Sequence, residues 1–253
     1  MNRIGLETLM VKETRRFLKV AGQTLAQPVV TTSLYFLVFG YALGGRVREI
    51  DGVPYSQFIA PGLVLLTVTQ NAFLNTSSSM FIAKIQGTIV DLLIAPLGVF
   101  DLMVAFLGAA VLRGVLTGGL VWFISALFTT FSIAQPVWLL VYVLLVAIAF
   151  AAIGLCVAIW SDKFEQLNVI PTFVLTPLTF LGGVFYSAHM LPSPWDTITR
   201  CNPILYMVEG LRYGFLGTAT TSPWLGLAIT GGIAATATVL AAWMFATGYK
   251  LRS

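Results

Sequence analysis

The chain has 253 residues, of which 58% are hydrophobic and 9% are charged, and its mean hydropathy is +0.90. A soluble domain is about half apolar and about a quarter charged, so this composition excludes an ordinary soluble protein and indicates an integral membrane protein. The formal net charge of +4 arises from scattered basic residues. They form no basic and aromatic patch of the kind that binds nucleic acid, and we expect no nucleic-acid partner.

Residues 3–20 predict an amphipathic helix, and we assign residues 1–24 to an interfacial segment. Its apolar side is made of Leu6, Leu9, Met10, Phe17 and Leu18. Its basic side is made of Arg3, Lys12, Arg15, Arg16 and Lys19. Two interpretations remain open: a helix in the headgroup plane that contacts a soluble partner, or a basic flank that only orients the first span. Both place this end of the chain in the cytoplasm.

Six apolar runs follow, each close to or above the roughly 20 residues that a spanning helix needs. These runs are 28–44, 58–83, 102–131, 137–160, 169–185 and 224–249. With the N-terminus inside, the inner segments hold nine Lys and Arg residues and the outer segments hold four, which favours cytoplasmic N- and C-termini. The expected fold is therefore an all-α membrane protein with six transmembrane helices in one domain over residues 1–253.

The segment 84–101, between the second and third runs, carries one Lys and two Asp in a chain with few charges. Its apolar residues at helical spacing include Ile85, Ile89 and Leu92. Lys84 and Asp91 lie off that face, and Pro96 ends the helix. A short amphipathic helix of this kind either docks a soluble partner or only lies on the membrane surface, and the residue pattern leaves both open.

The segment 186–221, on the outer side, predicts two short helices. Each begins with a capping side chain followed by a proline, which is a common helix start. The two starts are Ser193-Pro194 and Asn202-Pro203, and the helices are expected near Pro194–Arg200 and Pro203–Leu216. Glu209 and Arg212 stand three residues apart and can form an ion pair. The second helix is apolar but too short to span, so we expect a re-entrant hairpin that dips into the outer leaflet.

The only histidine and the two cysteines give no sign of a metal site or of a redox motif. Cys156 and Cys201 stand far apart, one in an apolar run and the other in a polar segment, so we expect no disulfide between them. His189 has no second His or Cys at ligand spacing. The first twenty residues carry five basic and two acidic groups and lack the apolar core of a secretory signal, so we expect no cleavable signal.

Three stretches resemble the permeases of type-2 ABC exporters, above all the bacterial inner-membrane branch with nodulation-factor, polysaccharide and drug exporters. They are IVDLLIAP at 89–96, LGGVFYSAHMLPSPW at 181–195 and NPILYMVEGLRYGFLG at 202–217. The resemblance covers nearly the whole chain. It implies that 84–101 holds a coupling helix that fits a groove on a separate ATPase, and that 186–221 forms re-entrant helices at the outer mouth. It also implies a homodimer with two ATPase subunits, embedded in membrane lipids.

The resemblance also assigns candidate residues. Coupling to the ATPase is expected from Lys84, Gln86, Ile89, Asp91, Leu92 and Pro96. The outer hairpin is expected to depend on Asn202, Pro203, Glu209 and Arg212. Phe185 and Tyr186, at the outer end of the fifth run, are candidates for a hydrophobic gate, although such residues are also typical of an aromatic belt.

Polar side chains inside the apolar runs have two interpretations: they only hold the helices together, or some of them line a substrate path. The candidates are Gln70, Asn71, Asn75 and Arg113. At about 1.5 Å per residue, Arg113 lies about 16 Å into the third run, at the depth of Gln70 and Asn71. A charge at that depth must face protein or water. Two interpretations remain open: Arg113 bonds to these amides and holds helices together, or it faces the path and meets an anionic head of the cargo.

No Gly-x-x-x-x-Gly-Lys-Ser/Thr loop occurs, so we expect no catalytic residue and no cofactor in this chain, with ATP and Mg²⁺ on the partner ATPase. The predicted function is the permease subunit of an ATP-driven exporter in the bacterial inner membrane. Its cargo is expected to be amphipathic: a lipid-linked glycan, a lipid or a hydrophobic drug. One alternative is a secondary transporter or channel without an ATPase, which the lack of Asp and Glu within the runs disfavours. Another is a structural subunit of a larger complex.

Overall fold

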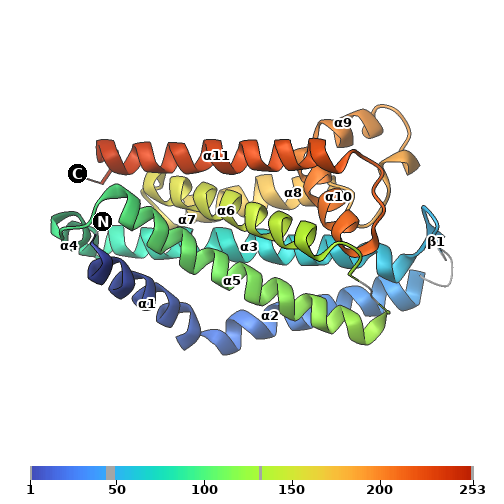
Figure 1. Ribbon diagram of the computed structural model, residues 1–253, viewed down its shortest axis with the longest axis horizontal. Coiled ribbons are helices and arrows are strands. Elements are labelled where there is room, and N and C mark those ends of the chain that lie inside the picture. The colour runs from blue at the N-terminus through green and yellow to red at the C-terminus, as the bar shows by residue number, and fades with distance from the viewer. Residues whose placement is uncertain (1, 44–48, 131–132, 252–253) are drawn as a thin grey trace.

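The computed structural model describes residues 2–43, 49–130 and 133–251 as an elongated bundle of helices (Figure 1). A short hairpin of two strands, β1 (Glu49–Ile50) and β2 (Val53–Pro54), lies at one end. Four of the described helices are long and apolar enough to cross a membrane. They are α3 (Tyr55–Ile85), α5 (Val99–Phe128), α6 (Pro136–Trp160) and α11 (Pro223–Thr247). The all-α membrane class is thus confirmed.

The other two predicted spans are interrupted helices, and no single helical piece of either, among the described residues, is long enough to cross a membrane. In the first, α2 (Ala21–Tyr35) continues directly into a π-helix, η1 (Phe36–Leu43); Gly44 lies outside the described residues. In the fifth, three short pieces follow one another: α7 (Phe164–Val169), the π-helix η2 (Ile170–Leu175) and α8 (Thr176–Phe180). Pro171 and Pro177 supply no N–H to the helical ladder, which favours such interruptions. Four of the six expected spans are therefore supported by length and composition.

The two ends of the bundle differ in what they carry (Figure 1). At the first, called here the α4 end, α1 (Arg3–Lys19) begins, α4 (Thr88–Ile94) joins α3 to α5, and α11 ends. At the opposite, α10 end lie the remaining short helices. These are η3 (Ala188–Met190), α9 (Trp195–Cys201) and α10 (Pro203–Leu216).

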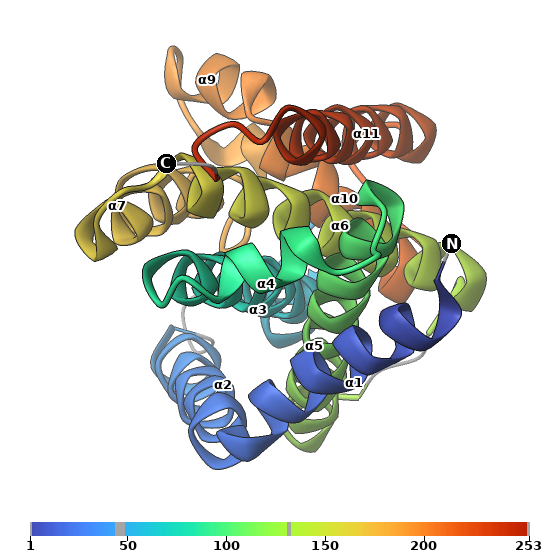
Figure 2. The ribbon, with the colours of Figure 1, turned by 90° about the vertical axis from the view of Figure 1, so that its left-hand side faces the viewer.

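The predicted N-terminal helix is confirmed almost to the residue, and it packs on the bundle. The Asn2 side chain caps α1 by accepting from the Gly5 N–H at 3.1 Å, and the Asn2 N–H donates to Asp101 Oδ2 at 3.2 Å. Leu9 and Phe17 are buried on the side that faces the bundle. Seen from the α4 end, α1 crosses in front of α5 (Figure 2), and α2 also packs against α5.

Helix α3 is the central helix, and it packs against both α5 and α6. Small residues permit the close approach: a Cβ atom at Gly154 of α6 would lie only 2.5 Å from the Phe73 carbonyl oxygen of α3. Thr76 joins the same two helices, because its Oγ1 donates to the Ala151 carbonyl at 2.7 Å. Since α3 is covered on most sides, its many polar side chains face protein instead of lipid.

Candidate functional site

A polar cavity of about 270 Å³ lies between α2, α3, α5 and α8. Its polar lining residues are Gln27, Thr31, Thr67, Gln70, Asn71, Arg113, Thr176 and Thr179. The two interrupted helices form one side of it, and the regular helices α3 and α5 form the other. Three of the predicted path residues, Gln70, Asn71 and Arg113, are therefore brought together in one space.

Arg113 is held by neutral amides of α3. Its Nε donates to Asn71 Oδ1 at 3.2 Å, and its Nη1 donates to Asn75 Oδ1 at 3.5 Å. Asn71 is oriented in turn by donating to the Thr67 carbonyl at 3.0 Å. Over the described ranges, no carboxylate oxygen lies within 4.0 Å of the Arg113 guanidinium. The prediction that Arg113 and Asn71 share a depth is confirmed, while the Arg113 charge has no counter-ion among the described residues.

Asn75 connects this arginine to a second one on α1. Arg16 Nη2 donates to the Asn75 carbonyl at 2.8 Å and to Asn75 Oδ1 at 3.3 Å. Unlike Arg113, Arg16 has an acidic partner: its Nε lies 3.2 Å from Glu13 Oε2, which also accepts from Ser79 Oγ at 2.5 Å. Glu13 is not among the residues that the sequence pattern predicts for the site. Its position between Leu9 and Phe17, at i+4 on the apolar face, was the available signal that it is buried.

An aromatic cluster stands beside the polar cavity. Phe185 is its centre, with ring centroids 5.3 Å from Tyr35, 4.9 Å from Phe39 and 5.5 Å from Phe180. Tyr35 and Phe180 line the cavity themselves, so Phe185 lies directly behind its wall. Tyr186 points elsewhere, because its hydroxyl is 3.4 Å from Thr199 Oγ1 of α9. Of the two predicted gate residues, Phe185 alone packs against the lining of the cavity.

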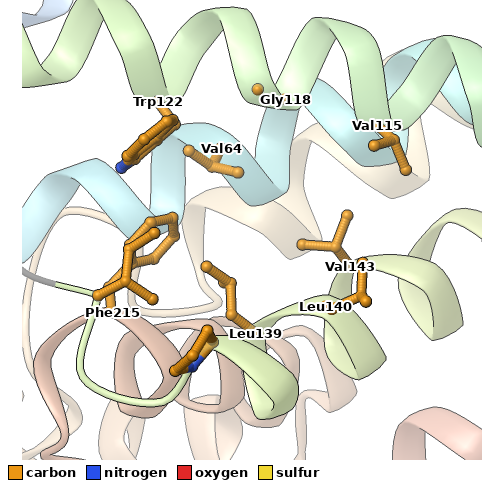
Figure 3. Close-up of a pocket in the computed structure, with 11 residues that line it drawn as sticks. Val64, Val115, Gly118, Trp122, Leu139, Leu140, Val143 and Phe215 are labelled. Carbon is orange, nitrogen blue, oxygen red and sulfur yellow. The ribbon is translucent and has the colours of Figure 1, made fainter.

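A different pocket, near the α10 end, is almost entirely apolar (Figure 3). It has a volume of about 260 Å³ and lies between α3, α5, α6 and α10. Its larger side chains include Val64, Val115, Trp122, Leu139, Leu140, Val143 and Phe215 (Figure 3). It offers no charged group to a polar ligand, so the polar cavity is the better candidate for a substrate with a polar head.

Helix α4 has a buried face and an exposed face. The residues on these faces differ from the prediction, in which Ile85, Ile89 and Leu92 share one face. Ile89 is 4% exposed and belongs to the apolar core of the chain, and Leu92 is half-buried against that core. The exposed apolar side chains are Val90 and Ile94, and Asp91 is exposed beside them. Gly87 separates α3 from α4 with φ of 73°, a value that favours glycine. This break turns Ile85 away from the face that it was expected to share with Ile89.

Lys84 is directed into the chain's own structure. Its Nζ donates to the carbonyls of Ile159 and Ser161 at 3.0 and 2.8 Å, at the C-terminus of α6, where cations are favoured. It also lies 3.2 Å from Asp162 Oδ1, and Lys250 Nζ lies 2.6 Å from Asp162 Oδ2. Hydrogen bonds from Lys250 and Lys84 hold the pKa of the Asp162 carboxyl below its ordinary value. The remaining predicted coupling residues, Gln86 and Pro96, are exposed.

The α10 end contains the buried ion pair that the sequence predicts. Glu209 and Arg212 are each buried and bonded to each other, and Arg212 Nη2 donates to the Gly183 carbonyl at 3.0 Å. The Arg212 guanidinium lies 3.7 Å from the centroid of the Phe58 ring, a cation–π contact. The backbone N–H of Thr220 donates to Glu209. One pair thus connects α10 with α3 and with the segments on both sides of α10.

The two predicted helix starts at this end differ in outcome. Asn202 caps α10 as expected, since its Oδ1 accepts from the Ile204 N–H at 3.0 Å and Pro203 is the first helical residue. Its amide also donates to the Leu178 carbonyl at 2.6 Å and so joins α10 to α8. The prediction for Ser193 is wrong: α9 begins one residue later than expected, and Pro194, which has no side-chain donor or acceptor, occupies the cap position.

A helical bundle with four membrane-length helices, two of which line a polar cavity, is typical of a multi-pass membrane permease. Residues 5–216 match the model of the ABC-2 type transporter family. The chain is 42% identical over 214 residues to the inner membrane transport permease YadH of Escherichia coli (strain K12), covering 85% of this chain and 84% of YadH. It is 28% identical over 194 residues to nodulation protein J of Sinorhizobium fredii (strain NBRC 101917 / NGR234), covering 76% of this chain and 72% of that protein. The chain therefore belongs to the ABC-2 type transporter family. It is an inner-membrane transport permease, the transmembrane subunit of its transporter and not the ATPase.

Proposed function

We propose that this permease is the membrane subunit of an ATP-driven exporter that moves an amphipathic molecule out of the cytoplasm or the inner leaflet. The observation that carries the proposal is the polar cavity, which holds Arg113 among amides and hydroxyls between the helices. A wholly apolar cargo would not need these groups, and a wholly polar cargo would not suit the aromatic cluster beside them. Phe185 is the proposed gate on that side.

The proposed assembly is a homodimer with two copies of an ABC ATPase. Support for a second permease copy comes from the exposed apolar side chains of the interrupted helices. They include Val30, Leu34, Leu37, Phe173, Val174 and Phe180. These residues flank the polar cavity, so a second copy on this face would enclose the cavity from the open side.

The proposed topology has six crossings with both termini in the cytoplasm. Two crossings beyond the four long helices are assigned to α2 with η1 and to α7 with η2 and α8. The support is that both interrupted segments lead from the α4 end toward the α10 end, as does α5 (Figure 1). In this topology α9 and α10 are the re-entrant hairpin, with the buried pair Glu209–Arg212 holding it to the long helices.

Single cysteines along α10 should then react with lipophilic reagents better than with charged ones added outside.

Coupling is proposed to run through α4. Its exposed face offers two apolar side chains, Val90 and Ile94, with Asp91 between them, while Ile89 and Leu92 connect the helix to the core of the permease. A push on the exposed face is therefore transmitted to buried side chains. The N-terminus of α1 lies on the same loop, because Asn2 also donates to the Pro96 carbonyl at 3.4 Å.

The experiment that tests this function uses the permease and its cognate ABC ATPase in lipid nanodiscs. We expect co-purification of the two subunits and ATP hydrolysis that candidate amphipathic cargoes stimulate. Asp91→Lys should abolish that stimulation while the permease keeps its thermal stability, because Asp91 is exposed and makes no internal ion pair in the described part of the chain. Glu49→Lys, at an exposed site of β1 and away from α4, is the matched control. Cargo transport that needs no ATPase would contradict the proposal and favour a secondary transporter.

A further inference from the structure

Arg113 lines a second cavity as well as the polar cavity. This apolar cavity has a volume of about 190 Å³ and lies between α1, α2 and α5. Its other lining residues are Phe17, Leu18, Ala21, Thr24, Leu25, Leu116, Thr117 and Leu120. One guanidinium therefore stands where a polar space and an apolar space meet, and a molecule with a polar head and a hydrocarbon tail matches both spaces at once.

The apolar cavity is accessible from the side of the bundle. Three leucines of its lining are partly at the surface: Leu18 is 51% exposed, Leu25 38% and Leu116 48%. They surround the corner where α1 ends and α2 begins, and Val20 at that corner is 49% exposed. Because α1 is amphipathic, this corner is suited to the boundary between headgroups and acyl chains. A tail can enter here directly from the leaflet.

Arg113 retains both charge and donors for a ligand. Its two protein partners, Asn71 and Asn75, are neutral amides that use Nε and Nη1. Its Nη2 has no hydrogen-bond partner within residues 2–43, 49–130 and 133–251, and it is not among the buried atoms without one. The nearby Arg16 is paired with Glu13, so these two groups add no net charge to the site. The site as a whole therefore carries one uncompensated positive charge, at the junction of the two cavities.

We propose that Arg113 anchors the anionic, phosphate-type head of an amphiphile whose tail occupies the apolar cavity and whose polar portion extends into the polar cavity. The guanidinium fork suits a phosphate, and a charged acceptor there removes the cost of an unpaired charge within the membrane. This role of Arg113 rests on the proposed function and makes it more specific, because it assigns the cargo to the anionic amphiphiles. Zwitterionic and uncharged amphiphiles of equal tail length are then poor ligands.

The test measures binding to the purified permease in uncharged detergent, without ATP or ATPase. Lysophosphatidic acid, which has one acyl chain and a phosphate monoester, is titrated against lysophosphatidylcholine of the same chain length by native mass spectrometry. We expect the anionic lipid to bind about tenfold more tightly or better, the usual contribution of one charge-assisted hydrogen bond. Inorganic phosphate at the same concentration should not displace it, since it lacks the tail. Displacement by free phosphate would overturn the amphiphile assignment.

Paired variants separate this site from general electrostatic attraction. Arg113→Gln keeps amide hydrogen bonding but removes the charge, and it should lose the tenfold preference. Arg15→Gln removes the same charge from an exposed neighbour on α1 and should leave the preference unchanged. Arg113→Lys retains the charge and should keep most of the preference, which covers the case in which the glutamine variant does not fold. Equal effects of Arg113→Gln and Arg15→Gln, or loss of the preference in Arg113→Lys, would overturn the site.

The tail is tested independently of the head. Ala21 lines the apolar cavity, so Ala21→Phe should fill part of it and weaken lysophosphatidic acid binding about tenfold, with a larger effect for longer chains. Ala26→Phe places the same ring on an exposed position of α2 and is the control. No change with Ala21→Phe would overturn the tail assignment. If the permease binds the anionic lipid selectively but couples to no ATPase, this binding site stands and the proposed function is wrong. If the permease couples to an ATPase but does not prefer the anionic lipid, only this binding site is wrong.

Discussion

Two arginines lie within the helical bundle, and the chain treats them in opposite ways. Arg212, at the α10 end, is buried, paired with Glu209 on its own helix and placed over the Phe58 ring. Arg113, in the middle of α5, is half-buried, and its side-chain partners within the described part of the chain are the amides of Asn71 and Asn75. The first charge is neutralised inside the protein, while the second has no counter-ion among the described residues and lies at the edge of two cavities.

The difference indicates that the charge of Arg212 stabilises the fold, whereas the charge of Arg113 remains available to a ligand. A buried ion pair is destabilising when one partner is removed, because the other is left unpaired in a low-dielectric surrounding. A guanidinium held by neutral amides has no such partner to lose, and its remaining donors can be satisfied by water in the cavity or by a ligand. We therefore expect variants at Arg212 and Glu209 to change stability, and variants at Arg113 to change transport.

The largest effect is expected for Glu209→Gln, which leaves the Arg212 charge buried without its partner. The free energy of unfolding should fall by about 3–5 kcal/mol, with lower abundance in the membrane and a lower melting temperature in detergent. Glu165→Gln, at an exposed site of α7, is the control and should leave the melting temperature unchanged. The double variant Glu209→Gln/Arg212→Gln should regain part of the loss. A stable Glu209→Gln protein would remove the distinction between the two arginines.

The next effect concerns Arg113→Gln, which keeps hydrogen bonding to Asn71 possible but removes the charge. Stability should change little, because the loss of the guanidinium's hydrogen bonds to the two amides is offset by the removal of an unpaired charge from within the membrane. Cargo transport in proteoliposomes containing the ATPase should fall about tenfold or more, because the anionic head loses its charged partner. Failure of the variant to assemble with the ATPase would instead make Arg113 a structural residue like Arg212.

A smaller effect is expected for Glu13→Gln. This change removes the acidic partner of Arg16 and leaves its charge unpaired, as the charge of Arg113 is. Loss of the charged acceptor for Ser79 and Arg16 should cost about 1–3 kcal/mol of stability. The site would then carry two uncompensated charges, so binding of an anionic amphiphile should strengthen. Glu7→Gln, at an exposed site on the same helix, is the control. If the two variants have the same melting temperature and affinity, Glu13 does not neutralise Arg16.

The smallest effect is expected at the surface, where Asp162 lies between Lys250 and Lys84. Its pKa is lowered in the folded state by hydrogen bonds from these lysines, so its contribution to stability is present above the ordinary pKa of about 3.9. That contribution is lost as the pH falls through the lowered pKa of the folded protein. The melting-temperature difference between wild type and Asp162→Asn should thus be constant from neutral pH to about pH 5 and then shrink. A difference that grows on acidification would contradict this assignment.

Local features of the sequence were sufficient for much of the fold. Apolar composition predicts the membrane class, because an apolar surface of this size is not stable in water. The starts of α1 and α10 follow from a capping side chain and helical periodicity, and the Glu209–Arg212 pair follows from i,i+3 spacing on one helix. These features depend on neighbours a few residues apart, so they can be seen in the order of the residues alone.

Contacts between distant segments were decided only by the tertiary structure. Spacing on a helix does not say which face meets the core, so the burial of Ile89 and the exposure of Val90 and Ile94 became visible only once α4 was packed against the bundle. Lys84 and Ile159 are far apart in the chain, as are Arg16 and Asn75, yet they are bonded to each other. The two cavities that share Arg113 arise from how α1, α2 and α8 lie against α3 and α5. Their shape depends on the packing of whole helices, which no local pattern of residues specifies.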